Sequence, residues 1–460
     1  MLDKSLVYEI LDTALASGAD FAEVFVENSL STSIQTGDRR VKNISSGQSF
    51  GIGIRVFKDL FSAYAYTNVM DRENLLKTAQ KAAAALREKR QASVLGFVDV
   101  EIENKHKIKI LHNSVNKSDK VSVMHKICET ACGASSLVTK ADATYLEKER
   151  QILVANSNGL WAEDKLSRGR FSLNVIAARD EKSQDSTDNF GGLYGFELFE
   201  GRDLQAFAEK TVSDAVSMLD AEDCPSGKMP VIIDNGFGGA IFHEACGHGL
   251  EATAVAKNAS VFCGKLGQKV ASELVTAYDD ATIPNAWGSI NIDDEGIAGQ
   301  RKILIENGIL KSYMVDSFNA RRMGMEPNGC ARRQNYKFMP TSRMSNTFIA
   351  NGNSTLEEMI AATDYGVFAE RMGGGSVNPA SGEFNFSVNK AYVIEKGRLK
   401  QLVKGAKLIG SGIEILNNID MVGNNMALAC GMCGSASGSI PTTVGQPAIR
   451  VQNITVGGQK

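Results

Sequence analysis

Residues 21–57 contain two runs in which apolar and polar side chains alternate, Phe21-Ala-Glu-Val-Phe-Val-Glu27 and Ser49-Phe-Gly-Ile-Gly-Ile-Arg-Val-Phe57. Alternation with a period of two is typical of β-strands that bury one face. Turn-forming pairs stand between the runs at Gly37-Asp38 and Ser46-Gly47. We therefore expect an antiparallel meander over this segment.

Helical and strand-like patterns alternate on both sides of this meander. Apolar residues at helical spacing predict helices over 3–17, 72–89, 117–133 and 202–220. Strand-like runs return at 144–147, 151–155 and 170–178, with a turn at Asn156-Ser-Asn-Gly159. Helices mixed with antiparallel strands, without a regular βαβ rhythm, predict an α+β fold.

The chain has 460 residues, which is too long for one ordinary core. A polar segment at 222–229 contains a Pro and a Gly and predicts a domain boundary. We expect an N-terminal α+β domain over residues 1–225 and a C-terminal domain over 226–460. The second should be largely β-structure, because it is rich in glycine and short strand-like runs and has few helical patterns.

Composition and charge exclude several classes of protein. The net charge of -3 includes no basic excess, which argues against nucleic acid as a partner. No run approaches 18 uncharged apolar residues, and the N-terminus lacks the apolar core of a signal peptide, so we expect no membrane span and no export. The predicted location is cytoplasmic, with the eight cysteines mostly reduced.

Two of only five histidines fall within six residues, in His243-Glu-Ala-Cys-Gly-His248. Zinc peptidases of the zincin type place their histidines four residues apart, on one helical face. A spacing of five rotates the second imidazole by about 140° on a regular helix. A π-type turn would bring the two nearly into line, and Gly247 and Gly249 would permit that distortion or end the helix.

A catalytic metal site usually has three protein ligands and one open position, so a third ligand is needed. A thiolate from Cys430-Gly-Met-Cys433 is the best candidate, in what reads as a glycine-rich loop. The same tetrapeptide also fits a structural role or a redox pair, although the Gly and Ser residues after it make a poor helix for the redox motif. Residue patterns alone leave these alternatives open.

The motif His243-Glu-Ala-Cys-Gly-His-Gly-Leu-Glu251 resembles the HExxxH signature of the TldD/TldE peptidases, also called modulators of DNA gyrase. Further resemblances run from residue 51 to the end of the chain. They are Gly51-Ile-Gly-Ile-Arg-Val, Arg332-Arg-Gln-Asn-Tyr, Arg343-Met-Ser-Asn-Thr, Gly373-Gly-Gly-Ser-Val-Asn-Pro-Ala-Ser-Gly-Glu-Phe, Val403-Lys-Gly-Ala-Lys-Leu-Ile-Gly and Val444-Gly-Gln-Pro-Ala-Ile-Arg-Val. TldE-type members lack the metal motif, so this chain resembles the TldD type.

The resemblance implies a metallopeptidase with one zinc ion per active site. His243, His248 and Cys433 would be the metal ligands and Glu244 the general base. It also implies dimers that enclose the active site and admit peptides or unfolded proteins. The pairing would be a homodimer or a heterodimer with a TldE-like paralogue, with the N-terminal domain covering the substrate groove.

Several other residues carry weaker expectations. Glu251 would accept a hydrogen bond from His248 and orient it, or would be a solvated carboxylate at the end of the helix. Gly373, Gly374, Gly375 and Ser376 would let a substrate backbone approach, or would form a plain mobile loop. We expect Cys246 to be a small core residue. The pair Arg332-Arg333 could grip a carbonyl or carboxylate of a peptide, but we expect it to be solvated or to lie at an interface. The alternatives to a peptidase are a non-catalytic regulatory or binding protein, and a thiol–disulfide oxidoreductase that uses Cys430 and Cys433.

Overall fold

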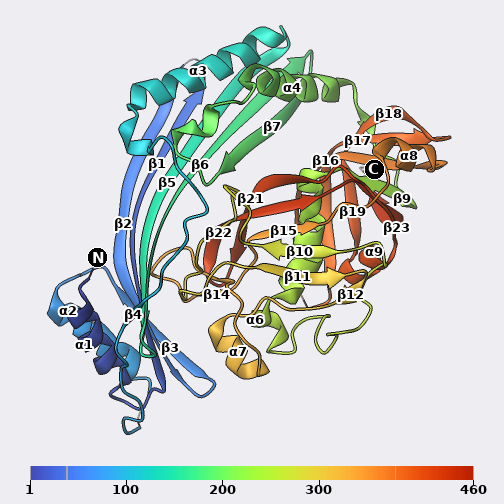
Figure 1. Cartoon of the computed structure of the whole chain (residues 1–460). Helices are drawn as coiled ribbons and strands as arrows, with labels where there is room; N and C mark the ends of the chain where they lie inside the picture. Colours follow the sequence, from blue (N-terminus) through green and yellow to red (C-terminus); the bar gives the residue numbers. More distant parts are fainter. Residues whose placement is uncertain (1, 38–39, 87, 379, 459–460) are drawn as a thin grey trace.

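The computed structural model describes residues 2–37, 40–86, 88–378 and 380–458, and its N-terminal half is built on one seven-stranded sheet (Figure 1). The strand order is β3-β2-β1-β5-β6-β4, and β7 pairs with β6. All pairings are antiparallel except that of β4 with β6. The strands are β1 (Phe21–Gly37), β2 (Arg40–Lys58), β3 (Phe61–Thr67), β4 (Val98–Asp99), β5 (Val138–Asn156), β6 (Leu160–Arg179) and β7 (Lys182–Gly192).

Two pairs of helices cover the two ends of this long, curved sheet (Figure 1). Helices α1 (Lys4–Leu15) and α2 (Arg72–Ala83) pack at one end, and α3 (Lys117–Ala134) and α4 (Leu204–Ser217) at the other. The side chains of Asp3, Asp71 and Asp203 cap α1, α2 and α4 by accepting a backbone N–H. Short 3₁₀ turns complete this half: η1 (His112–Ser114), η2 (Phe196–Phe199) and η3 (Met218–Asp220).

All four predicted helices are confirmed, but the second ends at Ala83 instead of residue 89. Its apolar face buries Leu75, Ala79 and Ala82, and Leu86 still packs against the same core after the turn that ends the helix. The turn at 156–159 is confirmed, because β5 ends at Asn156 and β6 begins at Leu160.

The turn predicted at Ser46-Gly47 is wrong. Strand β2 is continuous there, and Ser46 and Gly47 stand opposite Thr32 and Ser31 of β1. An uninterrupted partner strand satisfies the backbone hydrogen bonds and outweighs the local turn preference of the two residues. The other predicted turn falls between β1 and β2, and its Asp38 lies outside the described residues.

The C-terminal half consists mainly of two further sheets. In the eight-stranded sheet, β17 pairs with both β19 and β16, so that β16, β9, β23, β19 and β17 form a closed ring. Its strands are β8 (Glu222–Asp223), β9 (Gly227–Ile233), β16 (Tyr365–Val377), β17 (Glu383–Glu395), β18 (Arg398–Lys404), β19 (Ala406–Ser411), β20 (Ile419–Val422) and β23 (Ile449–Gly457).

The six-stranded sheet has the order β12-β11-β10-β15-β22-β21, which makes β21 an edge strand. Its strands are β10 (Ala277–Asp280), β11 (Arg301–Glu306), β12 (Ile309–Leu310), β15 (Asn346–Ile349), β21 (Ala427–Ser435) and β22 (Gly438–Gln446), while β13 (Ala331–Arg332) pairs only with β14 (Thr341–Ser342).

Helices in this half are short, and a broken helical segment, light green in Figure 1, runs between the strands. The helical elements are η4 (Gly236–Gly239), α5 (Ala240–Phe242), η5 (His243–Gly247), η6 (His248–Leu250), α6 (Ala252–Val255), α7 (Ser317–Met323), α8 (Leu356–Ala361) and α9 (Gly412–Asn417). The predicted α+β class, with helices and largely antiparallel sheets, is confirmed.

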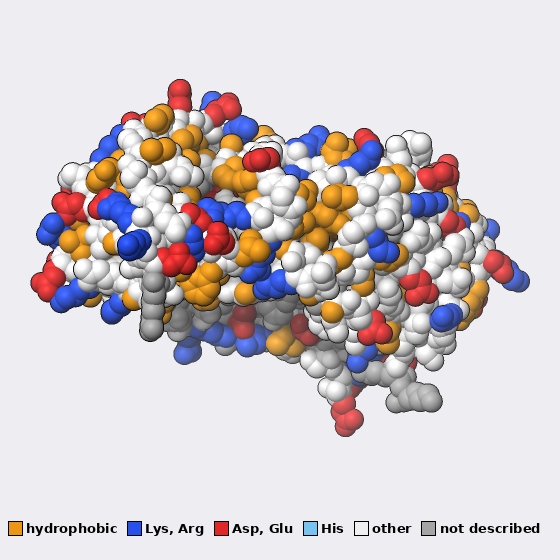
Figure 2. Space-filling view, turned by 90° about the horizontal axis from the view of Figure 1, so that it is seen from below, with side chains coloured by type: hydrophobic (Ala, Val, Ile, Leu, Met, Phe, Trp, Pro, Cys, Tyr) orange, Lys and Arg blue, Asp and Glu red, His pale blue; other side chains and the backbone are white. Residues whose placement is uncertain are grey.

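The surface in Figure 2 intersperses Lys and Arg with Asp and Glu, and apolar side chains gather near the middle of this face. Among the described residues, no helix has the length and apolar character needed to cross a lipid bilayer.

Candidate metal centre

The two histidines of the motif stand at the start and just past the end of a π turn, which is one of the two conformations that their spacing and the neighbouring glycines allow. Residues His243–Gly247 form the π-helical turn η5, and the backbone N–H of His248 donates to the carbonyl of His243 five residues earlier. The imidazole rings are consequently close, with centroids 5.2 Å apart. The π-turn prediction is confirmed.

Close packing around η5 explains the glycines near it. A Cβ on Gly247 would stand 2.2 Å from Met344 Sδ, and one on Gly249 would stand 2.8 Å from the ring of Phe262. A Cβ on Gly412, at the start of α9, would stand 2.2 Å from the carbonyl oxygen of Ala245 in the turn itself. These glycines admit neighbouring atoms, and none of the three has a positive φ.

Cys433 is brought to the two histidines from 185 and 190 residues away. Its Sγ lies 3.3 Å from His243 Nε2 and 3.3 Å from His248 Nε2. The three ligand atoms lie within 4.8 Å of one another. His243 and Cys433 are buried, and His248 is partly buried. Four-coordinate zinc with ordinary bond lengths separates N and S ligands by about 3.5 Å, so the donor set fits such an ion.

Cys430 does not join this group. The expected glycine-rich loop is wrong, because both cysteines lie in β21, where Cys430 pairs with Thr443 and Cys433 with Ile440. Residues three apart on a strand point to opposite faces, about 10 Å apart along the chain. The partner strand β22 holds the segment extended, whereas glycine content alone suggested a loop.

The imidazole of His248 is held by a carboxylate that is itself buried. Its Nδ1 lies 3.2 Å from Glu251 Oε2, and Glu251 Oε1 lies 3.9 Å from Arg343 Nε. Arg343 also donates to the carbonyl of Cys433 at 2.6 Å. The arginine therefore ties the cysteine strand to the carboxylate behind His248.

Electrostatics distinguish the two histidines. Burial, with smaller effects of His248 and Arg343, holds the pKa of His243 well below its usual value. Burial also disfavours charge on His248, but Glu251 together with the hydrogen bond to Cys433 outweighs it and raises the pKa to about 11. His243 Nδ1 is buried without a hydrogen-bond partner among the described residues.

Glu244 lies beside the group, with its Oε2 3.7 Å from His248 Nε2. Its side chain is 28% exposed, whereas that of Glu251 is 6% exposed, so solvent reaches Glu244 more readily. Burial raises its pKa, an effect that His248 opposes and Glu251 reinforces. A carboxylate with a raised pKa is suited to accept and return a proton near neutral pH.

Gly373, Gly374, Gly375 and Ser376 lie in strand β16, not in a loop. They pair with β17 through an irregular register, and Ser387 Oγ donates to the carbonyl of Gly374. None of the four appears in the metal-ligand group or lines the large cavity described below.

The remaining expectations are settled by burial. Cys246 is fully buried in the main core of the C-terminal half, as expected, and burial raises the pKa of its thiol. Arg333 lies at an interface, where it pairs with Glu23 of β1 at 2.9 Å. Arg332 is also buried and donates to the carbonyl of Met344. A solvated pair is therefore excluded.

The position of Arg343 in the site could not be predicted from the sequence. This arginine stands within a quoted motif but has no periodicity or neighbouring partner that marks it as part of the site. Its full burial and its contacts with Cys433 and Glu251 arise only when β21 packs over the π turn.

Models of the PmbA/TldA metallopeptidase family match nearly the whole chain: domain 1 at 22–86, the central domain at 111–219 and the C-terminal domain at 226–458. A metalloprotease TldD homolog of Haemophilus influenzae is 35% identical, and the match covers 99% of this chain and 97% of that protein. A metalloprotease of Methanocaldococcus jannaschii is 33% identical, with 94% and 96% covered, and a zinc metalloprotease TldD homolog of Saccharolobus solfataricus is 24% identical, with 98% and 100% covered.

Solved structures share the fold at lower identity. A putative modulator of a DNA gyrase from Thermotoga maritima superposes with a TM-score of 0.80 at 21% identity, covering 99% of this chain and 100% of that one. TldE from Thermococcus kodakarensis gives 0.79 at 20% identity, with 98% and 100% covered.

The fold and the convergent His, His and Cys side chains define the class of protein as a metallopeptidase. The chain belongs to the PmbA/TldA metallopeptidase family, which is the TldD/TldE family that its sequence motifs resemble. It is similar over its full length to TldD-type members.

Proposed function

We propose that this metallopeptidase uses one zinc ion, held by His243, His248 and Cys433, to hydrolyse peptide bonds in flexible peptides or unfolded proteins. The observation that carries the proposal is the convergence of three ligand atoms within 4.8 Å, with Glu244 3.7 Å from one of them. Two nitrogen donors and one sulfur donor suit zinc and leave one position for water or substrate.

Bound zinc would polarise the scissile carbonyl and make a water molecule acidic enough to ionise near neutral pH. Glu244 accepts the proton of the attacking water and returns it to the leaving amine. Glu251 holds the His248 ring with Nε2 directed at the metal, which is the usual task of a carboxylate behind a histidine ligand. Arg343 lies 3.9 Å from Glu251 and donates a hydrogen bond to the carbonyl of Cys433, which fixes the backbone there.

The substrate and the assembly are part of the same proposal. Residues 1–225 form a domain that shapes and covers the groove leading to residues 226–460, and the protein acts in the cytoplasm. It pairs with a second copy or with a TldE-like paralogue, which the likeness to a TldE structure supports. If a substrate in the groove reaches β16, Gly373–Ser376 contact its backbone.

A thiol–disulfide function for Cys430 and Cys433 has poor support. Their Cα atoms are about 10 Å apart along a strand, and a disulfide needs at most about 7 Å. Burial raises the pKa of the Cys430 thiol to about 11, which disfavours the reactive thiolate. A non-catalytic binding protein would bind no zinc or would cleave no peptide, so metal content and hydrolysis together distinguish it.

The two cysteines provide the test. Cys433→Ala should lower zinc content, measured by elemental analysis, and peptide hydrolysis together, because it removes a ligand. The matched control Cys430→Ala should keep both within a few-fold of wild type. A reversed pattern would move the ligand to Cys430, and full activity of both variants would remove the thiolate from the site.

A further inference from the structure

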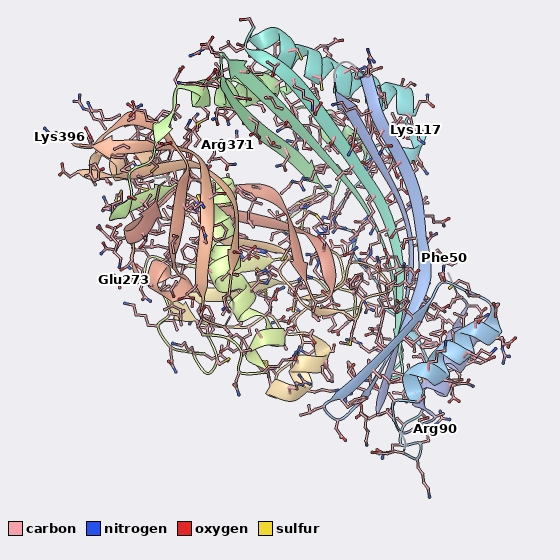
Figure 3. The ribbon with its side chains drawn as sticks, turned by 180° about the vertical axis from the view of Figure 1, so that it is seen from behind. Phe50, Arg90, Lys117, Glu273, Arg371 and Lys396 are labelled. Atoms are coloured by element: carbon pink, nitrogen blue, oxygen red, sulfur yellow. The ribbon has the colours of Figure 1, made fainter. Side chains whose placement is uncertain are left out.

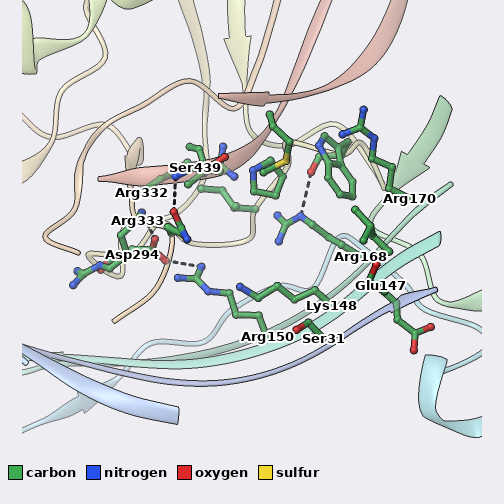
Figure 4. Close-up of a pocket in the computed structure, with 18 of the residues that line it drawn as sticks. Ser31, Glu147, Lys148, Arg150, Arg168, Arg170, Asp294, Arg332, Arg333 and Ser439 are labelled. Atoms are coloured by element: carbon green, nitrogen blue, oxygen red, sulfur yellow. Dashed lines mark hydrogen bonds and ion pairs between the residues drawn. The ribbon is translucent and has the colours of Figure 1, made fainter. Parts of the chain in front are cut away.

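A cavity of about 450 Å³ lies between the N-terminal sheet and the C-terminal half (Figure 4). One wall is the face of β1, β5 and β6 that bears Ser31, Lys148, Arg150, Arg168 and Arg170. The opposite wall contains Arg332 and Arg333, together with residues of the β21–β22 hairpin. Six cations therefore line the cavity, against the carboxylates of Glu147, Asp293 and Asp294.

Ion pairs account for only part of this charge. Arg150 pairs with Asp294 at 2.9 Å, Arg333 pairs with Glu23, and Lys148 stands 3.5 Å from Glu27. Glu147 is paired with Lys120, outside the cavity. Asp293 accepts three backbone N–H groups, so its oxygens are already occupied, and burial beside Glu295 raises its pKa.

Three arginines remain without an ion pair among the described residues. Arg168 donates to the carbonyls of Trp287 and Ser289, and Arg332 to that of Met344. Arg170 stands beside the ring of Trp287, and its buried Nε has no hydrogen-bond partner in the part of the chain that the structure describes. Burial and neighbouring arginines lower the pKa of Arg168 to about 9.

The arrangement of the cations on the sheet is itself unfavourable. Lys148 of β5 stands directly opposite Arg168 of β6, and like charges facing each other across two strands destabilise a sheet. An anion bound between Lys148 and Arg168 would offset their repulsion and would give Arg168 an ion-pair partner. The guanidinium fork matches the two oxygens of a carboxylate.

The rest of the lining indicates what carries the anion. Trp287, Ile290, Met432, Ile440 and Pro441 give the cavity a large apolar surface, and its volume is that of an organic ligand, not of an inorganic ion. Met432 directly precedes Cys433 on β21, and Ile440 pairs with Cys433 across the hairpin. The cavity and the metal centre therefore share a wall one strand thick.

We propose that this cavity binds a carboxylate of the peptide substrate, supplied by its C-terminus or by an acidic side chain. The inference rests on the proposed peptidase function and names a preference of the same site. The cations hold the carboxylate and the apolar wall packs against the neighbouring part of the peptide.

Binding is tested on the full-length, zinc-loaded Glu244→Gln protein by titration calorimetry, so that substrate is not cleaved. Three peptides share one apolar sequence: one has a free C-terminus, one is amidated with an internal Asp, and one is amidated with Asn in its place. At least one anionic peptide should bind about tenfold more tightly than the neutral one, and which one does so identifies the source of the carboxylate.

Arg170→Gln and Lys148→Gln should reduce that preference to less than threefold, because they weaken binding of the anionic peptides more than binding of the neutral peptide, whereas Arg170→Lys should restore part of it. Arg179→Gln is the matched control, because Arg179 lies on the same strand but pairs with the exposed Asp220. The inference would be overturned if both variants kept the preference, or if all three peptides bound equally. It would also be overturned if inorganic phosphate displaced the acidic peptides from a site at which neither substitution changes binding.

Hydrolysis by the wild-type enzyme is measured separately. Acid-selective binding without cleavage would reject the peptidase mechanism and leave the cavity assignment standing. Cleavage without acid selectivity would reject the cavity assignment alone.

Discussion

At the scale of single residues, the carboxylates of the metal centre differ in exposure. Glu251 is buried between His248 and Arg343 and can act only through the histidine. Glu244 is partly exposed and close to the ligand atoms, which is what a proton acceptor for an attacking water requires. The difference assigns the two groups different tasks in the same proposed mechanism.

Glu244→Gln is expected to retain zinc close to one ion per chain and to lose about 10²- to 10⁴-fold in peptide hydrolysis. The amide keeps the size of the side chain and cannot accept the proton. Elemental analysis and a fluorogenic peptide assay on the same preparation check the result. Normal turnover of the metal-loaded variant would remove Glu244 from its assigned role.

At the scale of elements, the π turn η5 does what a regular helix cannot. It carries His243 and His248 on one face, and α9 packs against it so closely that Gly412 touches the carbonyl of Ala245. π turns are rare, and those that occur are often found at functional sites. Tight packing from outside is part of what holds this one.

Gly412→Ala should destabilise the protein by about 1–3 kcal/mol, because the new methyl group meets a backbone atom that cannot move independently of the turn. Zinc occupancy should fall with it as the histidines are displaced. Thermal unfolding and metal content measure the two effects.

The matched control is Gly434→Ala, which lies directly after Cys433 but whose added Cβ meets nothing within 4 Å. It should leave stability and zinc content near those of wild type. If Gly412→Ala behaved in the same way, the packing of α9 would not be what shapes the turn.

At the scale of the whole molecule, ion pairs join the two halves at both ends of the interface. Near the helices α1 and α2, buried Arg55 of β2 pairs with Glu23 and also with Glu295 of the C-terminal half. At the other end, Asp214 of α4 pairs with Lys390 of β17 and with Arg371 of β16, and Figure 3 shows Arg371 at this junction. These contacts set the position of the sheet that forms one wall of the cavity.

Asp214 should make this junction sensitive to acid. Burial alone would raise its pKa, but hydrogen bonds from Lys390 and Lys210 outweigh this effect and lower it to about 2. The stabilisation is present above pH ~4 and is lost as the pH falls from about 4 to about 2. We expect it to be on the order of 1–2 kcal/mol after solvent screening.

Asp214→Asn should therefore lower the free energy of unfolding at pH 7, and the difference from wild type should shrink below pH 4. Denaturant unfolding at both pH values measures it. Asp220→Asn is the control, because its pair with Arg179 is exposed and should contribute little. A difference that does not depend on pH would mean that the charge of Asp214 is not what stabilises the junction.

The proposed enclosure of the active site by a dimer is also tested at the scale of the whole molecule. If the metal lies in an enclosed space, an unfolded protein should be cut at least about tenfold faster than the same protein held folded by a bound ligand, because only a flexible chain can enter. Gel analysis of both forms with one enzyme preparation checks this. Equal cleavage rates would count against enclosure.

The sequence by itself determined most of the local structure and two of the three candidate metal ligands. Alternation predicted the long strands, helical spacing predicted the helices, and five-residue spacing indicated a π turn as one way to bring the histidines together, because each depends on residues close together in the chain. The pairing of Cys433 with histidines 185 and 190 residues away followed from family resemblance and not from any local pattern. Only the tertiary structure decided that the cysteine pair lies on a strand, that Arg343 joins that strand to Glu251, and that Lys148 faces Arg168. Each of these depends on which distant strands become neighbours and in what register, and no single segment contains that information.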